Sequence, residues 1–254
     1  MFTRKDIIKL MVPLIIEQVL AVAIGMADTM MVASCGEAAV SGVSLVDSIN
    51  VLLINIFSAL ATGGSIICAQ YIGRDDHANA NASAKQLIAA TFLVSAVIMI
   101  VCLFGNGLIL SAIFPNTENA VMENCLIYFF WSAISYPFLG VYNAGAALFR
   151  SMGNSRITMV ISVAMNLLNI GGNAVLIFGF HMGVAGAAIA TLVSRIFGAV
   201  VTLYLLRWRS HGITIDSLLR GRLDFRMIRT ILKIGIPNGL ENGMFQIGKI
   251  LVQG

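Results

Sequence analysis

Two carboxylic acids and three amides stand inside long apolar stretches, where polar side chains are expensive. Asp28 follows Glu17 by eleven residues, so on a helix with about 100° per residue both acids share one face. Asn166, Asn169 and Asn173 recur at i, i+3 and i+7, which places their amides on one stripe of a helix. A carboxylate among amide and hydroxyl oxygens can take up a proton or a sodium ion. Placed opposite Asp28, the stripe therefore predicts a site for a coupling cation.

Plainer roles fit the same residues. Glu17 stands where a membrane boundary is expected, so it can cap a helix or snorkel to the surface. Asp28 is only six residues from Ser34 and can belong to the opposite interface. The asparagines can instead form hydrogen bonds between helices. Both readings stay open for all of these side chains.

Other polar residues inside apolar stretches are candidates for lining or gating a cavity. Arg195 stands one turn beyond Thr191, after a run of small residues, and must face protein, water or an anion. We expect a buried acid as its partner, but the sequence does not identify which one. Tyr136 precedes Pro137, which predicts a helix kink. The full set of cavity or gating candidates is Glu17, Asn50, Asn55, Tyr136, Asn166 and Arg195.

The elements that position these side chains are membrane helices. The chain of 254 residues is 58% hydrophobic and 11% charged, whereas about a quarter of the residues in soluble domains are charged. A bilayer core about 30 Å thick needs roughly 20 apolar residues per helix. The stretches that meet this length run at about 7–34, 48–73, 86–117, 124–149, 157–179 and 183–206. The fold class is thus all-α: a polytopic six-helix transmembrane lobe, with a seventh helix beginning near Ile228.

Basic residues occur on alternate connections between these spans. Fourteen of the 16 Lys and Arg residues precede the first span or follow the second, fourth and sixth. The other connections hold only Glu37, Asp47, Glu118, Glu123 and His181 as ionisable residues. Because basic loops stay in the cytoplasm, we expect a cytoplasmic N-terminus in a multi-pass inner or plasma membrane protein. The net charge of +4 then reflects topology and contact with membrane lipids, so no nucleic-acid partner is expected.

Motifs of enzymes and metal sites are missing from the sequence. The four cysteines are scattered singly, without C-x-x-C, and there is no H-E-x-x-H, G-x-S-x-G or phosphate loop. We expect no enzyme activity and no cofactor. The only metal considered is a possible Na⁺ at Asp28, as an alternative to a proton.

A weak repeat divides the chain. Lys, Pro and Glu of the stretch 233–241 match those of 9–17 at an offset of 224 residues. We therefore expect a lobe at 1–210, a basic linker at 211–227 and the start of a second lobe at 228–254. A sequence that stops within a seventh helix is expected to be truncated. Without the second lobe we expect no transport from residues 1–254 alone.

Four stretches of the chain form a recognisable set: Gly25-Met-Ala-Asp28-Thr-Met-Met-Val-Ala33, Ala69-Gln70-Tyr-Ile-Gly73-Arg-Asp-Asp76, Ala147-Leu-Phe-Arg150-Ser-Met-Gly153-Asn-Ser-Arg156 and the region from Asn169 to Thr191. In this order they resemble the multidrug and toxic compound extrusion (MATE) family of secondary transporters, and together the likeness covers essentially the whole chain.

The resemblance implies twelve helices in two lobes, which export organic, often cationic, compounds against inward flow of protons or sodium. Asp28 matches the family's acid in the first helix, and Asn169 and Thr191 match polar partners of that acid in one branch. Asn173 stands where that branch has a second acid, so the identity of the coupling ion stays open.

Other functions remain open from the sequence. A lipid-linked oligosaccharide flippase of the same superfamily would need more basic residues in its cavity than Arg195. A membrane-embedded enzyme or a structural subunit is the remaining alternative.

Overall fold

The structure is a computed structural model that describes residues 4–207 together with 228–231, 233, 235 and 237. Helices account for every regular element in these ranges, so the predicted all-α class is confirmed. In chain order the elements are α1 (Arg4–Ala33), α2 (Glu37–Gly73), α3 (His77–Phe104), α4 (Asn106–Ile113), α5 (Asn119–Ser151), α6 (Ser155–Asn173), the π-helical η1 (Ala174–Gly179) and α7 (Gly183–Arg207).

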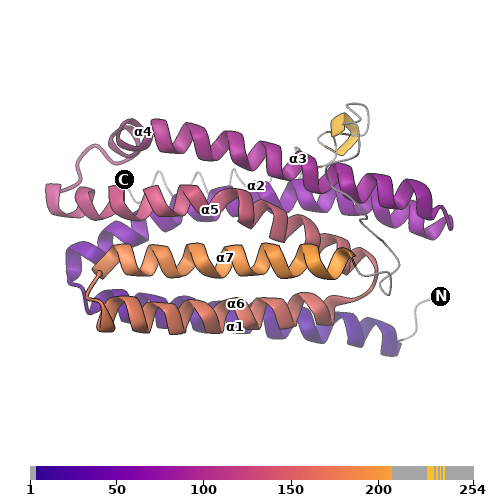
Figure 1. The fold of residues 1–254 in the computed structure, drawn as a ribbon, viewed down its shortest axis with the longest axis horizontal. Helices are drawn as coiled ribbons and strands as arrows, with labels where there is room; N and C mark the ends of the chain where they lie inside the picture. Colours follow the sequence, from indigo (N-terminus) through magenta and orange to yellow (C-terminus); the bar gives the residue numbers. More distant parts are fainter. Residues whose placement is uncertain (1–3, 208–227, 232, 234, 236, 238–254) are drawn as a thin grey trace.

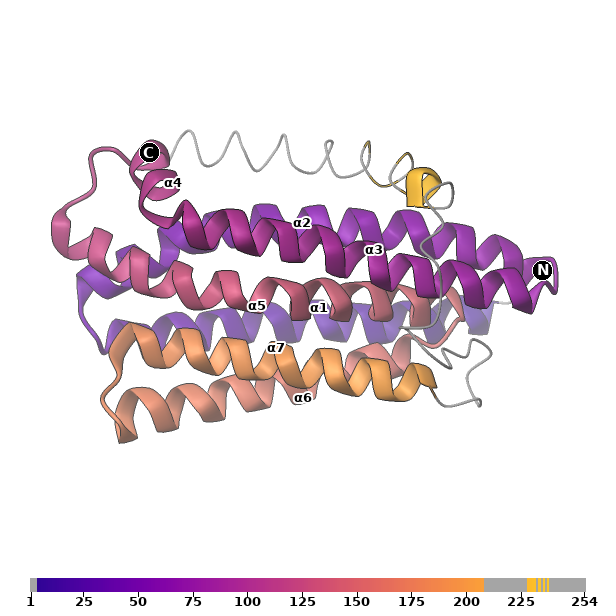
Figure 2. The same ribbon diagram turned by 45° about the horizontal axis from the view of Figure 1, so that its top comes forward.

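The long helices run roughly parallel or antiparallel to one another, with α5 at the centre (Figures 1 and 2). Helix α5 packs against α2, α3 and α7, while α1 packs mainly against α6. The hydrophobic core follows this arrangement, since the side chains of Phe129, Tyr136 and Phe149 on α5 are fully buried. The centre of the lobe is thus built on α5, and α1 is held to it largely through α6.

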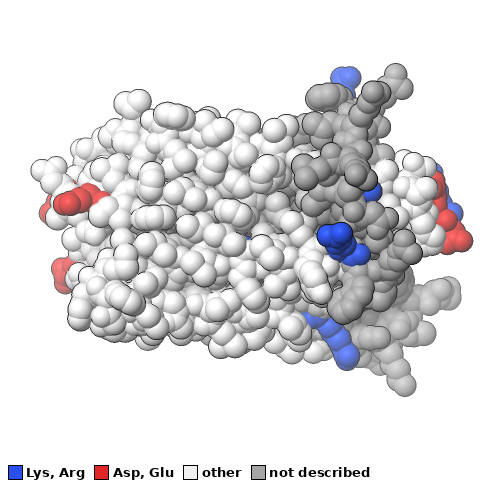
Figure 3. All heavy atoms as spheres, viewed as in Figure 1, with Lys and Arg blue, Asp and Glu red and all other residues white. Residues whose placement is uncertain are grey.

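Successive connections lie at opposite ends of the bundle (Figure 1). Residues 34–36, α4 and residues 180–182 lie at one end, and residues 74–76 and 152–154 lie at the other. Within the part of the chain that the structure describes, five helices are long and apolar enough to cross a membrane: α2, α3, α5, α6 continued by η1, and α7. Six spans were expected, and the first of them, α1, does not meet this criterion. On the face in Figure 3, charged side chains gather near the two ends and the wide middle is almost entirely uncharged. These are the properties of a multi-pass membrane protein.

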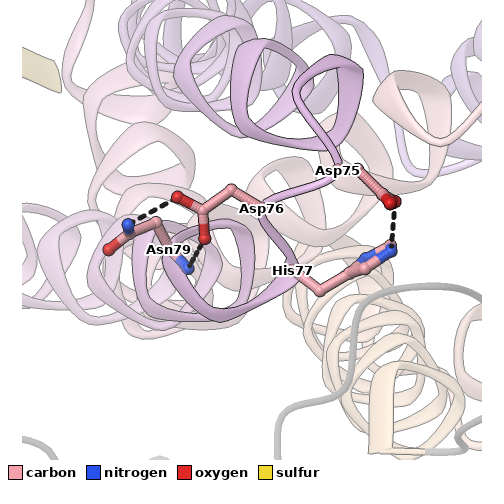
Figure 4. A network of polar contacts seen from close by, with 4 residues as sticks. All are labelled: Asp75, Asp76, His77 and Asn79. Atoms are coloured by element: carbon pink, nitrogen blue, oxygen red, sulfur yellow. Dashed lines mark hydrogen bonds and ion pairs between the residues drawn. The ribbon is translucent and has the colours of Figure 1, made fainter.

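The turn from α2 to α3 has a local chemical cause. Asp76 precedes α3, and its carboxylate accepts hydrogen bonds from the Asn79 backbone N at 3.1 Å and from Asn79 Nδ2 at 2.7 Å (Figure 4). Asp75 has a positive φ of 59°, and its Oδ1 pairs with His77 Nε2 at 3.1 Å. An acidic N-cap satisfies backbone N–H groups that have no partner in the first turn. The two bonds from Asn79 hold the pKa of Asp76 below its usual range.

Two predicted spans have different bounds in the structure. Helix α2 begins at Glu37, eleven residues before the expected start, because the charged Asp47 lies inside the helix and the uncharged stretch begins only after it. Asp47 therefore lies within α2, and placing it in a connection was wrong. The expected span 86–117 is divided at Gly105 into α3, which begins earlier at His77, and the short α4.

Residues 228–231, 233, 235 and 237 are helical, as expected for the start of another helix. A Cβ on Gly63 of α2 would meet the backbone N of Gly235 at 2.8 Å and the carbonyl O of Ile231 at 2.9 Å. Only a glycine allows so close an approach between these backbones. The expected linker 211–227 and residues 238–254 lie outside the described residues.

Candidate functional site

Asp28 lies near the end of α1 and faces the end of α6. Its side chain is partly buried, and its Oδ1 accepts a hydrogen bond of 2.5 Å from Nδ2 of Asn173. Asn173 is 1% exposed and is the last residue of α6 before the π-helical turn. An amide donor so deep in the lobe has little water to bond instead, so the carboxylate is its natural partner.

Asn169 adds a second amide one turn earlier on α6. As placed, Nδ2 of Asn169 donates to Oγ1 of Thr191 at 3.1 Å, which leaves the amide oxygen facing the carboxylate of Asp28. Exchanging the nitrogen and oxygen puts the nitrogen 2.8 and 2.9 Å from the two Asp28 oxygens, and the oxygen then accepts from Thr191 at 3.1 Å. We favour the exchanged orientation, because two acceptors facing each other repel while this arrangement satisfies every partner.

Small residues bring Thr191 of α7 to this position. A Cβ on Gly172 would lie 2.9 Å from Cβ of Ala190, and one on Gly186 would lie 3.0 Å from Cβ of Leu176. The backbones of α6 and α7 therefore approach closely, as stretches of small residues permit in membrane helices.

The helix geometry changes directly after Asn173. Residues 174–179 form a π-helix, and the backbone N of Phe180 bonds to the carbonyl O of Val175. Single π turns are rare and often occur at functional sites. Periodicity predicted one regular helix here, so this feature was missed.

A second group of polar residues, which the sequence did not predict as a group, lies on α2 and α5. Asn50 is buried and donates to Oδ1 of Asp47 at 3.1 Å, while its own oxygen accepts from the hydroxyl of Tyr136 at 2.9 Å. The hydroxyl of Tyr128 also hydrogen-bonds with the Asp47 carboxylate. Asn50 and Tyr136 were expected to line a cavity, but Asp47, the charge at the centre of this group, was not anticipated. The i, i+3 spacing of Asp47 and Asn50 was the signal available.

Arg195 of α7 reaches the same region. Its Nη1 donates to Oγ of Ser135 on α5 at 2.6 Å. The buried acid expected as its direct partner is therefore a hydroxyl instead, although Asp47 is near enough to attract the guanidinium. Asp47 is also near enough to repel Asp28, so the two polar groups adjoin.

The remaining candidates lie elsewhere. Asn166 donates to Oγ of Ser162 on its own helix at 3.5 Å, and among the described residues no hydrogen bond joins it to Asp28. It shares the stripe but lies about two turns, or roughly 10 Å, before Asn173 along α6. Glu17 is partly buried near Arg150 of α5, and its Oε2 has no hydrogen-bond partner among the described residues. Asn55 is partly buried on α2 and joins neither polar group among the described residues.

The site around Asp28 has the chemistry of a monovalent cation site. In addition to the carboxylate it offers Oγ1 of Thr191 and Oδ1 of Asn173, a buried acceptor oxygen without a hydrogen-bond partner among the described residues. An orphaned buried oxygen beside a carboxylate fits a proton or a sodium ion. Within the described part of the chain, no group of three or more His, Cys, Asp or Glu side chains could hold a metal ion.

Comparison with known proteins places this lobe among transporters. A family model described as MatE matches residues 13–175. The uncharacterized transporter YisQ of Bacillus subtilis (strain 168) is 29% identical over 255 residues, covering 94% of this chain and 53% of that protein. The probable multidrug resistance protein NorM of Thermotoga maritima is 27% identical over 255 residues, covering 98% and 53%. The chain thus spans about half the length of the curated relatives it matches.

Solved structures agree in fold. A crystal structure of MATE in the bent conformation has a TM-score of 0.85 at 23% identity, covering 94% of this chain and 53% of that one. An inward-facing multidrug resistance MATE family transporter of the MOP superfamily has a TM-score of 0.83 at 22% identity, covering 97% and 55%. At such identities the likeness concerns the fold alone.

Proposed function

The chain belongs to the MatE family, and from this premise we propose that it forms the first lobe of a cation-coupled antiporter that exports organic, often cationic, compounds. The relatives named multidrug resistance or multidrug export proteins support this class of substrate. As each of these relatives is about twice as long as the matched region, a second lobe supplies the opposite wall of the substrate cavity.

The observation that carries the proposal is the carboxylate of Asp28 between Asn169 and Asn173. Protonation or sodium binding removes the negative charge that these two amides meet. Helix α1 packs mainly on α6, and many of its apolar side chains, such as Ile15, Val19 and Met30, are exposed. A change at Asp28 therefore alters the principal attachment of α1 to the lobe, which biases the lobe between substrate-holding and substrate-releasing forms.

The decisive experiment replaces Asp28 by Asn in the intact transporter. Asp28→Asn keeps the shape of the side chain but removes its charge, so we expect ion-driven efflux to be lost while membrane insertion stays normal. Efflux of a fluorescent organic cation from everted vesicles, driven in turn by a proton and a sodium gradient, measures the effect. Asp75→Asn, in the exposed turn after α2, is the control and should transport normally. Undiminished efflux by Asp28→Asn would remove this residue from the mechanism.

Topology follows from the charge pattern. The end of the bundle that holds the basic connections faces the cytoplasm, together with the N-terminus, because basic loops resist translocation.

The alternatives are less favoured. Arg195, the basic residue that a flippase cavity would use, is bonded to Ser135 of its own lobe. The relatives are named as transporters rather than enzymes or structural subunits.

A further inference from the structure

A second carboxylate and a guanidinium lie beside the proposed cation site, and the mechanism above uses neither. Asp47 of α2 is near enough to repel the carboxylate of Asp28, and Arg195 of α7 is near enough to attract the carboxylate of Asp47. Arg195 stands one turn after Thr191, which itself bonds to Asn169 of the Asp28 site. Helix α7 therefore contributes one residue to each polar group: Thr191 to the site of Asp28 and Arg195 to the group around Asp47.

Hydrogen-bond donors surround the carboxylate of Asp47. Two neutral donors, the amide of Asn50 at 3.1 Å and the hydroxyl of Tyr128, point at its carboxylate. The amide of Asn50 is itself fixed by the hydroxyl of Tyr136 at 2.9 Å. Hydrogen bonds donated to a carboxylate stabilise its ionised form against the cost of burial, and the nearby guanidinium of Arg195 acts in the same direction. These donors also fix the position of the Asp47 carboxylate.

Among the described residues, Arg195 forms no direct ion pair. Its guanidinium donates to Ser135 at 2.6 Å. Its charge therefore acts on Asp47 without direct contact, in a part of the lobe where screening by water is weak. Any effect of Arg195 on Asp28 then passes through the charge of Asp47. The other titratable groups that face this region are Tyr128 and Tyr136 of α5 and Cys102 of α3.

The net charge of the cluster formed by Asp28, Asp47 and Arg195 determines how many cations it can bind. With all three residues ionised, the cluster carries one net negative charge, which a single monovalent cation neutralises. Without Arg195 it would carry two negative charges, and without Asp47 it would carry none. Because isolated charge in a membrane interior is expensive, the neutral state is the stable one.

We infer that Asp47 and Arg195 are positioning residues that set the cation affinity of Asp28, with Arg195 cancelling Asp47 so that the lobe takes one monovalent cation. This rests on the proposed function of Asp28. Helices α2 and α7 then take part in coupling. Loss of Asp47 should weaken cation binding, and loss of Arg195 should strengthen it.

Equilibrium cation binding tests the pair without requiring transport. The intact transporter in nanodiscs is melted over a series of Na⁺ concentrations, with choline as the control cation, and over a series of pH values. A ligand that binds only the folded state raises the melting temperature, and the dependence on concentration yields its affinity.

The two variants should shift the midpoint in opposite directions. Arg195→Gln should bind the cation more tightly and Asp47→Asn should bind it more weakly. The change should be about tenfold for a unit charge roughly 12 Å away at an effective dielectric constant of about 20, and larger for a shorter separation. The double variant should return close to the original midpoint, and so should Arg195→Lys, which keeps the charge. Glu37→Gln, an exposed acid in the first turn of α2, is the matched control and should leave the midpoint unchanged.

The outcomes separate the two claims. If Asp28→Asn abolishes the cation response but the Asp47 and Arg195 variants leave the midpoint in place, or shift it in the same direction, the inference fails and the site at Asp28 stands. If Asp28→Asn keeps the response, or the unaltered protein shows none to Na⁺ or protons, the proposed coupling site fails and the inference fails with it.

Discussion

At the scale of single residues, the lobe concentrates its polar chemistry where three helices meet. Asp28 is supplied by α1, the two amides by α6 and the hydroxyl of Thr191 by α7. Each of these side chains is neutral except the acid, so the site distributes one charge over several partners. That is the arrangement expected where a proton or sodium ion binds and leaves again.

Asn173→Leu should destabilise the lobe by about 1 to 3 kcal/mol, because the carboxylate of Asp28 loses its 2.5 Å donor while staying in an apolar setting. Asn166→Leu is the matched control on the same helix, since its amide bonds only weakly to Ser162 at 3.5 Å. Thermal unfolding of both variants in detergent measures the difference. Equal stability of the two would show that the bond to Asp28 contributes little.

Asp76 predicts a local dependence on pH. Its pKa is lower in the folded state, so its contribution is fully present above the unfolded value of about 4 and is lost as the pH falls through the lower folded value. Hydrogen-exchange protection at the start of α3 should therefore decrease below about pH 4. Asp76→Asn, which can still accept the backbone bond, should show less of this decrease. A pH response of the same size in the variant would assign the effect to another group.

At the scale of the elements, the approach of α7 to α6 decides whether Thr191 can reach the site. Adjacent glycines on α6 differ in this respect: a Cβ on Gly172 would contact Ala190, whereas one on Gly171 would meet nothing within 4 Å. The π-helical turn that follows Asn173 lies at the same interface. Packing between these two elements and the geometry of the site are therefore linked.

Gly172→Ala should lower the melting temperature and weaken cation binding, because the contact of 2.9 Å with Cβ of Ala190 pushes α7 away from α6. Gly171→Ala should be neutral or stabilising, by up to about 1 kcal/mol, since alanine favours the helix and the space is open. Calorimetry of the two variants side by side provides the comparison. A stabilised Gly172→Ala variant would mean that the interface can shift without loss.

At the scale of the whole molecule, the alternation of connections between the two ends matches the distribution of basic residues. The connections that contain Arg74, Arg150 and Arg156 or lie beside them are at one end of the bundle, and the connections without basic residues are at the other. The chain of a multi-pass membrane protein is oriented by such a difference.

Single cysteines test this orientation in a variant without the four native cysteines. Asp75→Cys should react with a membrane-impermeant maleimide only after the cells are permeabilised, whereas His181→Cys should react in intact cells, because both positions are exposed at opposite ends. Labelling of Asp75→Cys in intact cells would reverse the proposed topology. A residue on the lipid-facing middle, such as Val200→Cys, should label poorly in both conditions.

The amino-acid sequence by itself determined the class of the protein, the alternation of its ends and the candidacy of Asp28. These properties depend on how each segment meets lipid and water, and such interactions can be read along the chain. Only the tertiary structure decided that Asn169 and Asn173 bond to Asp28 while Asn166 bonds to Ser162, that Asp47 lies inside α2, and that Arg195 bonds to Ser135. Those outcomes depend on how helices that are distant in sequence rotate and pack against one another. The local sequence does not show which polar residue of a helix face will contact a neighbouring helix, because that depends on which helix packs there.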